Sequence, residues 1–163
     1  IGIIILARFN SKRLLGKALR SVGKKKLLEH VVSRLEAVFQ RDQLLIATSE
    51  KTTDDPIASF AESIGVNCFR GSLDKVGERF YAAACAHNFD IVVRVNGDNV
   101  LLDPFLIKEM LDIFEEKELD FMSNVKGRTF PKGVSVEIVR TEYYGTFLDS
   151  IKSNLFYNEH VMP

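Results

Sequence analysis

A short basic segment follows the first apolar run of the chain, and its residue types suit the binding of a polyphosphate. Residues 3–7 are apolar, and the ten residues after them include four cations, Arg8, Lys12, Arg13 and Lys17. Arginine and lysine tips, together with the backbone N–H groups of a loop, can surround a triphosphate. The spacing is that of neither a Walker loop nor a dinucleotide-binding loop, and a solvated basic loop is the alternative interpretation.

The charge of the chain is concentrated near its amino end. Eight Lys and Arg residues precede the first acidic residue, Glu29, so residues 1–28 carry a net charge of +8. Because 22 Lys and Arg balance 22 Asp and Glu over the whole chain, residues 29–163 carry −8. A local basic excess in a neutral chain suits a small anion better than a duplex, and we therefore expect no nucleic-acid partner.

A second candidate site lies in Arg94-Val95-Asn96-Gly97-Asp98, where an apolar strand ends in a Gly-Asp pair. A carboxylate at the carboxyl end of a strand, opposite a basic loop, is a natural ligand for Mg²⁺. An ordinary Gly-Asp turn is the alternative for Asp98. For Asp103, five residues later, we favour the role of a helix cap.

A third segment, residues 128–137, is a turn that leads into a strand. Alternation along the strand places Ser135 and Glu137 on one face. Glu137 could face the site, although an exposed sheet edge would give the same pattern. Two histidines have structural interpretations: His30 lies on an amphipathic helix, and His87 follows the end of another, where a cation suits the helix dipole.

Short apolar runs alternate with helical periodicity along the chain. Strands are predicted over 3–7, 44–48, 66–69, 91–95, 121–123 and 134–139, and helices over 28–39, 55–64, 72–87, from 103 onward and over 143–151, with Asp55, Ser72 and Asp103 as caps. This order predicts an α/β fold, a Rossmann-like three-layer α/β/α arrangement with a mostly parallel sheet. Ligands of such sheets lie beyond the carboxyl ends of the strands. Four segments meet that criterion: the loop after Ala7, the loop after Thr48, Arg70-Gly71-Ser72 and Asn96-Gly97-Asp98.

Length and composition fit one domain of 163 residues, 46% of them hydrophobic. No apolar run reaches the ~20 residues of a membrane span, and we recognise no signal peptide. Cys68 and Cys85 both lie among apolar residues, and we expect two buried free thiols in a reducing compartment. These observations predict a soluble, cytoplasmic protein with no membrane partner.

Taken in order, these segments resemble the cytidylyltransferase family, and most closely its spore-coat polysaccharide biosynthesis branch, near the enzymes that activate 3-deoxy-manno-octulosonate and acylneuraminate. Residues 7–17 match the family opening A-R-x-x-S-x-R-L-P-G-K, and Arg94-Val95-Asn96-Gly97-Asp98 matches R-x-T-G-D. Further matches are Leu27-Leu28-Glu29-His30-Val31, Ala47-Thr48-Ser49, Asp54-Asp55-Pro56, Phe69-Arg70-Gly71-Ser72, Leu102-Asp103-Pro104, Ser123-Asn124, Arg128-Thr129-Phe130-Pro131 and Glu159-His160-Val161.

The resemblance implies transfer of CMP from CTP to a sugar hydroxyl, with release of pyrophosphate and with Mg²⁺ as cofactor. It implies the nucleotide-diphospho-sugar transferase type of fold. Arg8, Lys17 and Asp98 would be the catalytic residues, with Asp98 on the metal. The residues that would bind the nucleotide are Ala7, Arg8, Ser11, Arg13, Lys17, Thr48, Ser49, Arg70, Gly71, Ser72, Asn96 and Gly97. Candidates for binding the sugar are Arg128, Phe130, Glu137 and His160, of which Arg128 or His160 could hold the carboxylate of a sugar acid.

The sequence departs from the family pattern at several positions. Leu15 replaces Pro, Asn96 replaces Thr, and Lys132 and Ser135 stand where related sequences carry Asp. A serine hydroxyl is a much poorer Mg²⁺ ligand than a carboxylate. The departures at Lys132 and Ser135 leave open a catalytically impaired nucleotide-binding or assembly protein. A sugar nucleotidyltransferase of the same architecture that uses UTP or GTP is a further alternative.

The resemblance also bears on the extent of the chain. Family members continue beyond the stretch that corresponds to Glu159-His160-Val161, so we expect residues 1–163 to form a single nucleotidyltransferase domain that lacks the C-terminal part of the family fold. Relatives also suggest a homodimer.

Overall fold

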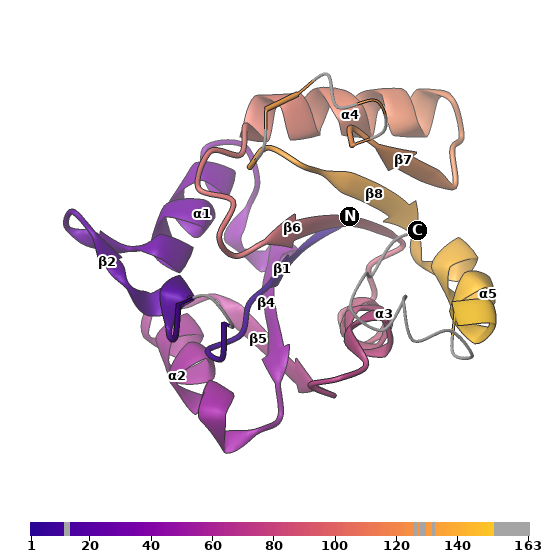
Figure 1. Cartoon of the computed structure of the whole chain (residues 1–163). Helices are drawn as coiled ribbons and strands as arrows, with labels where there is room; N and C mark the ends of the chain where they lie inside the picture. The colour runs from indigo at the N-terminus through magenta and orange to yellow at the C-terminus, as the bar shows by residue number, and fades with distance from the viewer. Residues whose placement is uncertain (12–13, 126, 128–129, 132, 152–163) are drawn as a thin grey trace.

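A central six-stranded sheet lies between two layers of helices (Figure 1). The computed structural model describes residues 1–11, 14–125, 127, 130–131 and 133–151, without the side chains of 149–151. The strand order is β5-β4-β1-β6-β8-β7. The strands are β1 (Gly2–Leu6), β4 (Leu44–Ser49), β5 (Asn67–Gly71), β6 (Ile91–Asn96), β7 (Phe121–Ser123) and β8 (Glu137–Arg140).

The sheet is mostly parallel, as predicted. β5, β4, β1 and β6 run in one direction, whereas β8 is antiparallel to both β6 and β7. The predicted final strand over 134–139 is shorter and later, at Glu137–Arg140. It lies inside the sheet between two partners, so it is not an exposed edge.

The helices divide between the two faces because side chains alternate along each buried strand. Ile3 and Ile5 of β1 pack into one core with α1 (Leu27–Leu35), α2 (Asp55–Ser63) and α4 (Pro104–Glu116), whereas Ile4 packs into a second core with α3 (Val76–Ala86) and α5 (Thr141–Ile151). All three isoleucines are fully buried. The three-layer α/β/α prediction is therefore confirmed.

Part of the basic segment forms a small hairpin that the sequence analysis did not predict. β2 (Ser21–Val22) pairs with β3 (Lys25–Lys26). The hairpin is fixed to α1, because His30 Nε2 lies 2.8 Å from the Val22 carbonyl oxygen. This contact confirms the structural interpretation of His30. Three short 3-10 helices, η1 (Lys17–Leu19), η2 (Arg41–Gln43) and η3 (Thr52–Asp54), were also unpredicted.

Two predicted helix starts need correction, and one is confirmed. α3 begins at Val76 with Lys75 as its N-cap, because Ser72 Oγ instead accepts a 3.1 Å hydrogen bond from the Lys75 N–H in the preceding turn. Asp54, not Asp55, is the N-cap of α2. Asp103 caps α4 as predicted, accepting from the N–H groups of Phe105 and Leu106.

The prediction that both cysteines are buried is wrong. Both thiols are free, but Cys68 is only partly buried and Cys85 is exposed. Cys85 and Ala86 point outward from the last turn of α3, whereas Ala83 and Ala84 are buried. Apolar neighbours in sequence did not reveal the outward face of the helix. Among the described residues, no helix has the length and hydrophobicity needed to span a membrane.

Candidate active site

The four segments predicted to approach a ligand lie at one edge of the sheet. Parallel pairing aligns the carboxyl ends of β5, β4, β1 and β6, as the pairs Ser49↔Gly71, Leu6↔Ala47 and Leu6↔Asn96 show. The loops after these strands therefore emerge side by side. This edge is where open α/β sheets bind their ligands.

Lys17 and Asp98 meet at this edge, although 81 residues separate them in the sequence. Lys17 Nζ forms an ion pair with Asp98 Oδ2, and 27% and 39% of the two side chains are exposed. Lys17 begins η1 after the loop that follows β1, and Asp98 lies in the turn after β6. The predicted cation and the predicted carboxylate thus come together in a place that solvent reaches.

Gly97 holds the ends of β1 and β6 close together. Its N–H donates a 2.8 Å hydrogen bond to the Leu6 carbonyl. A Cβ atom at this position would lie 3.1 Å from both Ala7 Cβ and Leu28 Cδ1, and 3.2 Å from the Leu6 carbonyl oxygen. A side chain at position 97 would push the two strand ends apart, and with them Lys17 and Asp98.

The loop after β1 is organised around Phe9. The Phe9 carbonyl accepts hydrogen bonds from the N–H groups of Ser11, at 2.9 Å, and Gly16, at 2.8 Å. Gly16 has a φ of +66°, and its Cα approaches the Phe9 ring so closely that a Cβ would lie 3.1 Å from it. Glycine suits both the left-handed backbone and the close contact. Arg8 is exposed beside this turn, and Arg13 lies outside the described residues.

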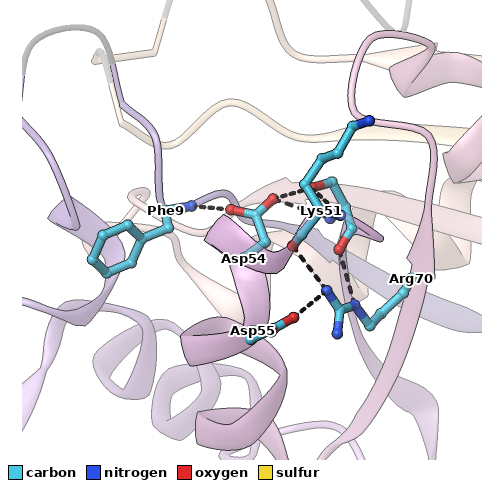
Figure 2. Close-up of polar contacts among 6 residues, drawn as sticks. Phe9, Lys51, Asp54, Asp55 and Arg70 are labelled. Atoms are coloured by element: carbon cyan, nitrogen blue, oxygen red, sulfur yellow. Dashed lines mark hydrogen bonds and ion pairs between the residues drawn. The ribbon is translucent and has the colours of Figure 1, made fainter.

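Asp54 is a residue of this site that the sequence analysis missed. Its side chain is fully buried. Oδ1 accepts from the Phe9 N–H at 2.7 Å, and Oδ2 accepts from the Ser49 N–H at 3.2 Å and from the Ser49 hydroxyl (Figure 2). The carboxylate therefore joins the loop after β1 to the end of β4. Its only sequence signal was its place in the matched Asp54-Asp55-Pro56 segment, which we interpreted as the start of a helix.

Arg70, predicted to bind the nucleotide, is engaged with the protein in this structure. Its Nε donates to the Ser49 carbonyl at 3.0 Å, and its Nη2 lies 2.9 Å from the Lys51 carbonyl oxygen and 2.6 Å from Asp55 Oδ1 (Figure 2). These contacts fold the loop after β4 back onto the end of β5. Arg70 thus shapes this loop, and its role toward a nucleotide stays a prediction.

Arg79 of α3 is a second missed residue. Its side chain is 4% exposed, its Nη1 donates to the Ser72 carbonyl at 2.5 Å, and its Nε has no hydrogen-bond partner among the described residues. Burial lowers the pKa of this guanidinium, Asp54 opposes that shift, and Arg8 adds to it. A Cβ on Gly71 would lie 3.0 Å from Arg79 Cγ, so the absence of a side chain at Gly71 leaves room for the arginine.

The remaining predicted nucleotide contacts have varied surroundings. Thr48 and Ser49 are fully buried at the end of β4, and the Thr48 hydroxyl has no hydrogen-bond partner among the described residues. Ala7 is buried as well, whereas Ser11 and Asn96 are partly exposed. The Thr48 and Ser49 side chains therefore form the interior of this edge of the sheet.

The predicted sugar-binding residues are only partly described. Glu137 forms an ion pair with Arg94 across the β6–β8 pair, and the two side chains are 13% and 19% exposed. Arg94 Nη2 also donates to Asn96 Oδ1 at 3.2 Å. Phe130 is exposed. Arg128 and His160 lie outside the described residues.

Asp98 is the candidate metal ligand, and it does not belong to a ready-made cluster. Within the described part of the chain, no group of three or more His, Cys, Asp or Glu side chains could hold a metal ion. A single exposed carboxylate still fits Mg²⁺, which usually keeps several waters and takes one or two carboxylates together with substrate phosphates.

Comparison with known proteins gives a consistent result. The sequence profile of a family described as cytidylyltransferase matches residues 2–163. An uncharacterized protein of Methanocaldococcus jannaschii is 33% identical over 160 residues, which are 98% of this chain and 64% of the relative. Spore coat polysaccharide biosynthesis protein SpsF of Bacillus subtilis is 36% identical over 140 residues, 83% of this chain and 57% of that protein. The chain thus spans less than two thirds of either relative.

Among solved structures, a cytidylyltransferase from Leptospira borgpetersenii superimposes with a TM-score of 0.90 at 32% identity. The match covers 99% of this chain and 68% of that one. Sequence profile and fold agree over nearly every residue, and the chain belongs to the cytidylyltransferase family.

Proposed function

We propose that this chain transfers CMP from CTP to a hydroxyl group of a sugar acid for surface polysaccharide biosynthesis. The acceptor oxygen attacks the α-phosphorus, the bond between the α-phosphorus and the bridging oxygen to the β-phosphate breaks, and pyrophosphate leaves. The hydroxyl proton passes to solvent. The observation that carries the proposal is the meeting of Lys17 and Asp98 at the ligand-binding edge of the sheet.

The chemistry asks little of the protein besides positioning and charge, because phosphoryl transfer needs no protein nucleophile. Lys17 and the exposed Arg8 would hold the triphosphate, with Ser11 and Arg13 as further contacts. Asp98 would hold Mg²⁺, which when bound offsets the charge of the phosphate oxygens. Lys17 would then exchange its partner Asp98 for a phosphate oxygen.

Support for the base and the acceptor comes from the family. Its name points to CTP, and the B. subtilis relative is named for spore coat polysaccharide biosynthesis. A sugar acid needs a cation for its carboxylate, and we assign Arg128 or His160 to that role. The resemblance further implies a homodimer in the cytoplasm.

The decisive experiment is an assay of pyrophosphate release by the protein. CTP, UTP, GTP and ATP are each supplied with Mg²⁺ and a panel of sugar acids and neutral sugars. We expect release with CTP and at least one sugar acid. Preference for UTP or GTP would overturn the assignment of the base, and no release with any pair would overturn the proposed activity.

One feature favours a second candidate, a catalytically impaired nucleotide-binding protein. Ser135 stands where related sequences carry an aspartate, and its backbone carbonyl accepts from Asn99 Nδ2 at 3.3 Å. If this candidate is right, the wild-type protein binds CTP with turnover near zero, and Ser135→Asp raises turnover. Full activity of the wild-type protein would exclude it.

A further inference from the structure

The carboxylate of Asp54 links two loops that both approach the proposed nucleotide site. It is fully buried, and it accepts hydrogen bonds from Phe9 on one side and from Ser49 on the other. Each of its oxygens serves a different loop. An ionised acceptor binds backbone N–H groups about twice as strongly as a neutral one, so this contact holds both loops firmly.

The contact with Phe9 reaches the predicted phosphate-binding side chains through the backbone. The Phe9 N–H binds Asp54, and the Phe9 carbonyl binds the N–H groups of Ser11 and Gly16. Arg8 precedes Phe9 in the chain, and Lys17 follows Gly16. The Phe9 backbone is therefore fixed at both its N–H and its carbonyl group. The Cα positions from which the Arg8 and Lys17 side chains extend depend on this backbone.

Electrostatics alone would argue against a carboxylate here. A negative charge close to a triphosphate site repels the ligand. Burial and Arg8 lower the pKa of Arg79, and Asp54 is near enough to this basic region to raise it. A buried acid at such a place needs a compensating benefit, and the hydrogen bonds that it accepts from the loop provide one.

We propose that Asp54 is a positioning residue for triphosphate binding: it anchors the Phe9 backbone and thereby sets the positions of Arg8 and Lys17. This inference rests on the proposed function, because it assumes that the loop after β1 holds phosphates. It predicts that removal of the side-chain oxygen that accepts from the Phe9 N–H weakens nucleotide binding, whereas charge repulsion alone predicts tighter binding once the charge is gone. The sign of the change separates the two.

The test compares Asp54→Asn with Asp54→Ala in the full-length protein. Both variants remove the same charge and the acceptor for the Ser49 N–H, but Asn keeps an amide oxygen that can accept from the Phe9 N–H. Isothermal titration of CTP should show affinity within about threefold of wild type for Asp54→Asn, and about tenfold weaker or worse for Asp54→Ala, since a lost hydrogen bond to a charged group corresponds to a factor of roughly ten or more.

Hydrogen exchange of the Phe9 amide provides a readout that does not depend on nucleotide binding. It should be slow in the wild-type protein, intermediate in Asp54→Asn and fast in Asp54→Ala. As a matched control, Asp103→Ala removes another carboxylate that accepts two backbone N–H groups. We expect this control to lower the melting temperature and to leave CTP affinity and Phe9 exchange unchanged.

Three results would overturn the inference: fast Phe9 exchange in the wild-type protein, equal CTP affinity of the Asn and Ala variants, or tighter binding by Asp54→Ala. If Asp54→Ala does not fold, Phe9 exchange in the wild-type protein and in Asp54→Asn decides. Failure of the wild-type protein to bind any nucleoside triphosphate would instead refute the proposed function, while Phe9 exchange would still report whether Asp54 anchors the loop.

Discussion

Replacement of Asp98 by Asn should separate stability from catalysis. The ion pair with Lys17 is partly exposed, at 27% and 39% of the two side chains, and pairs of this kind contribute at most about 1 kcal/mol. For a domain of this size, 1 kcal/mol corresponds to about 2–4 °C in melting temperature. We therefore expect Asp98→Asn to lower the melting temperature by no more than about 4 °C.

The effect of the same change on turnover should be far larger. A bound metal ion contributes several kcal/mol to stabilising the transition state, and each 1.36 kcal/mol is tenfold in rate. Mg²⁺-dependent pyrophosphate release should thus fall by roughly a hundredfold or more. CTP affinity measured without metal should not fall, because Lys17 loses a competing anion.

A matched control is available directly before β7, away from the carboxyl ends of the parallel strands. Asp120→Asn removes a carboxylate that lies 3.9 Å from Arg140 Nε and is 60% exposed. Its turnover should equal that of the wild-type protein. Wild-type turnover in Asp98→Asn would refute the metal assignment, and a fall of more than about 10 °C in its melting temperature would show that Asp98 is mainly structural.

Other contacts give predictions of their own. Lys17→Ala should weaken CTP binding, and titrations at low and high salt should show the difference from wild type shrinking as salt rises. Glu137→Gln leaves Arg94 partly buried without its carboxylate, and we expect it to lower the free energy of unfolding, measured in urea, by about 2 kcal/mol or more. The double variant with Arg94→Gln should lose less stability than the sum of the two single variants. Strict additivity would contradict the pairing. Burial raises the pKa of the Cys68 thiol, with Arg70 opposing, so less thiolate forms at a given pH. Iodoacetamide at pH 8 should therefore label exposed Cys85 first, and faster labelling of Cys68, detected by mass spectrometry of the peptides, would refute this.

The sequence was enough to predict the layers of the fold, because the buried strands are continuous apolar runs. The apolar run Ile3, Ile4 and Ile5 indicates a strand that is covered on both faces. The spacing of Ile107, Met110 and Leu111 indicates a helix. The β2–β3 hairpin could not be predicted in this way. Its two-residue strands are mostly polar, and a tertiary contact with His30 holds it in place.

The candidate site was predictable where strand order alone brings residues together. Lys17 and Asp98 follow neighbouring parallel strands, so their approach could be expected from topology. Asp54 could not be found, because its hydrogen-bond donors include a backbone N–H 45 residues away that no sequence pattern displays. Arg70 resembled a ligand-binding cation, but backbone carbonyls and Asp55 engage its guanidinium.

The close packing at Gly97 limits how far the ends of β1 and β6 can move apart. β1 is an inner strand of the parallel part of the sheet, and the N–H of Gly97, the residue that follows β6, donates to the carbonyl of Leu6, the last residue of β1. Separating the two strands would expose fully buried residues of β1 such as Ile3, Ile4 and Ile5. Motions that admit or release a ligand should therefore occur in the surrounding loops, while the joined ends of β1 and β6 stay in place.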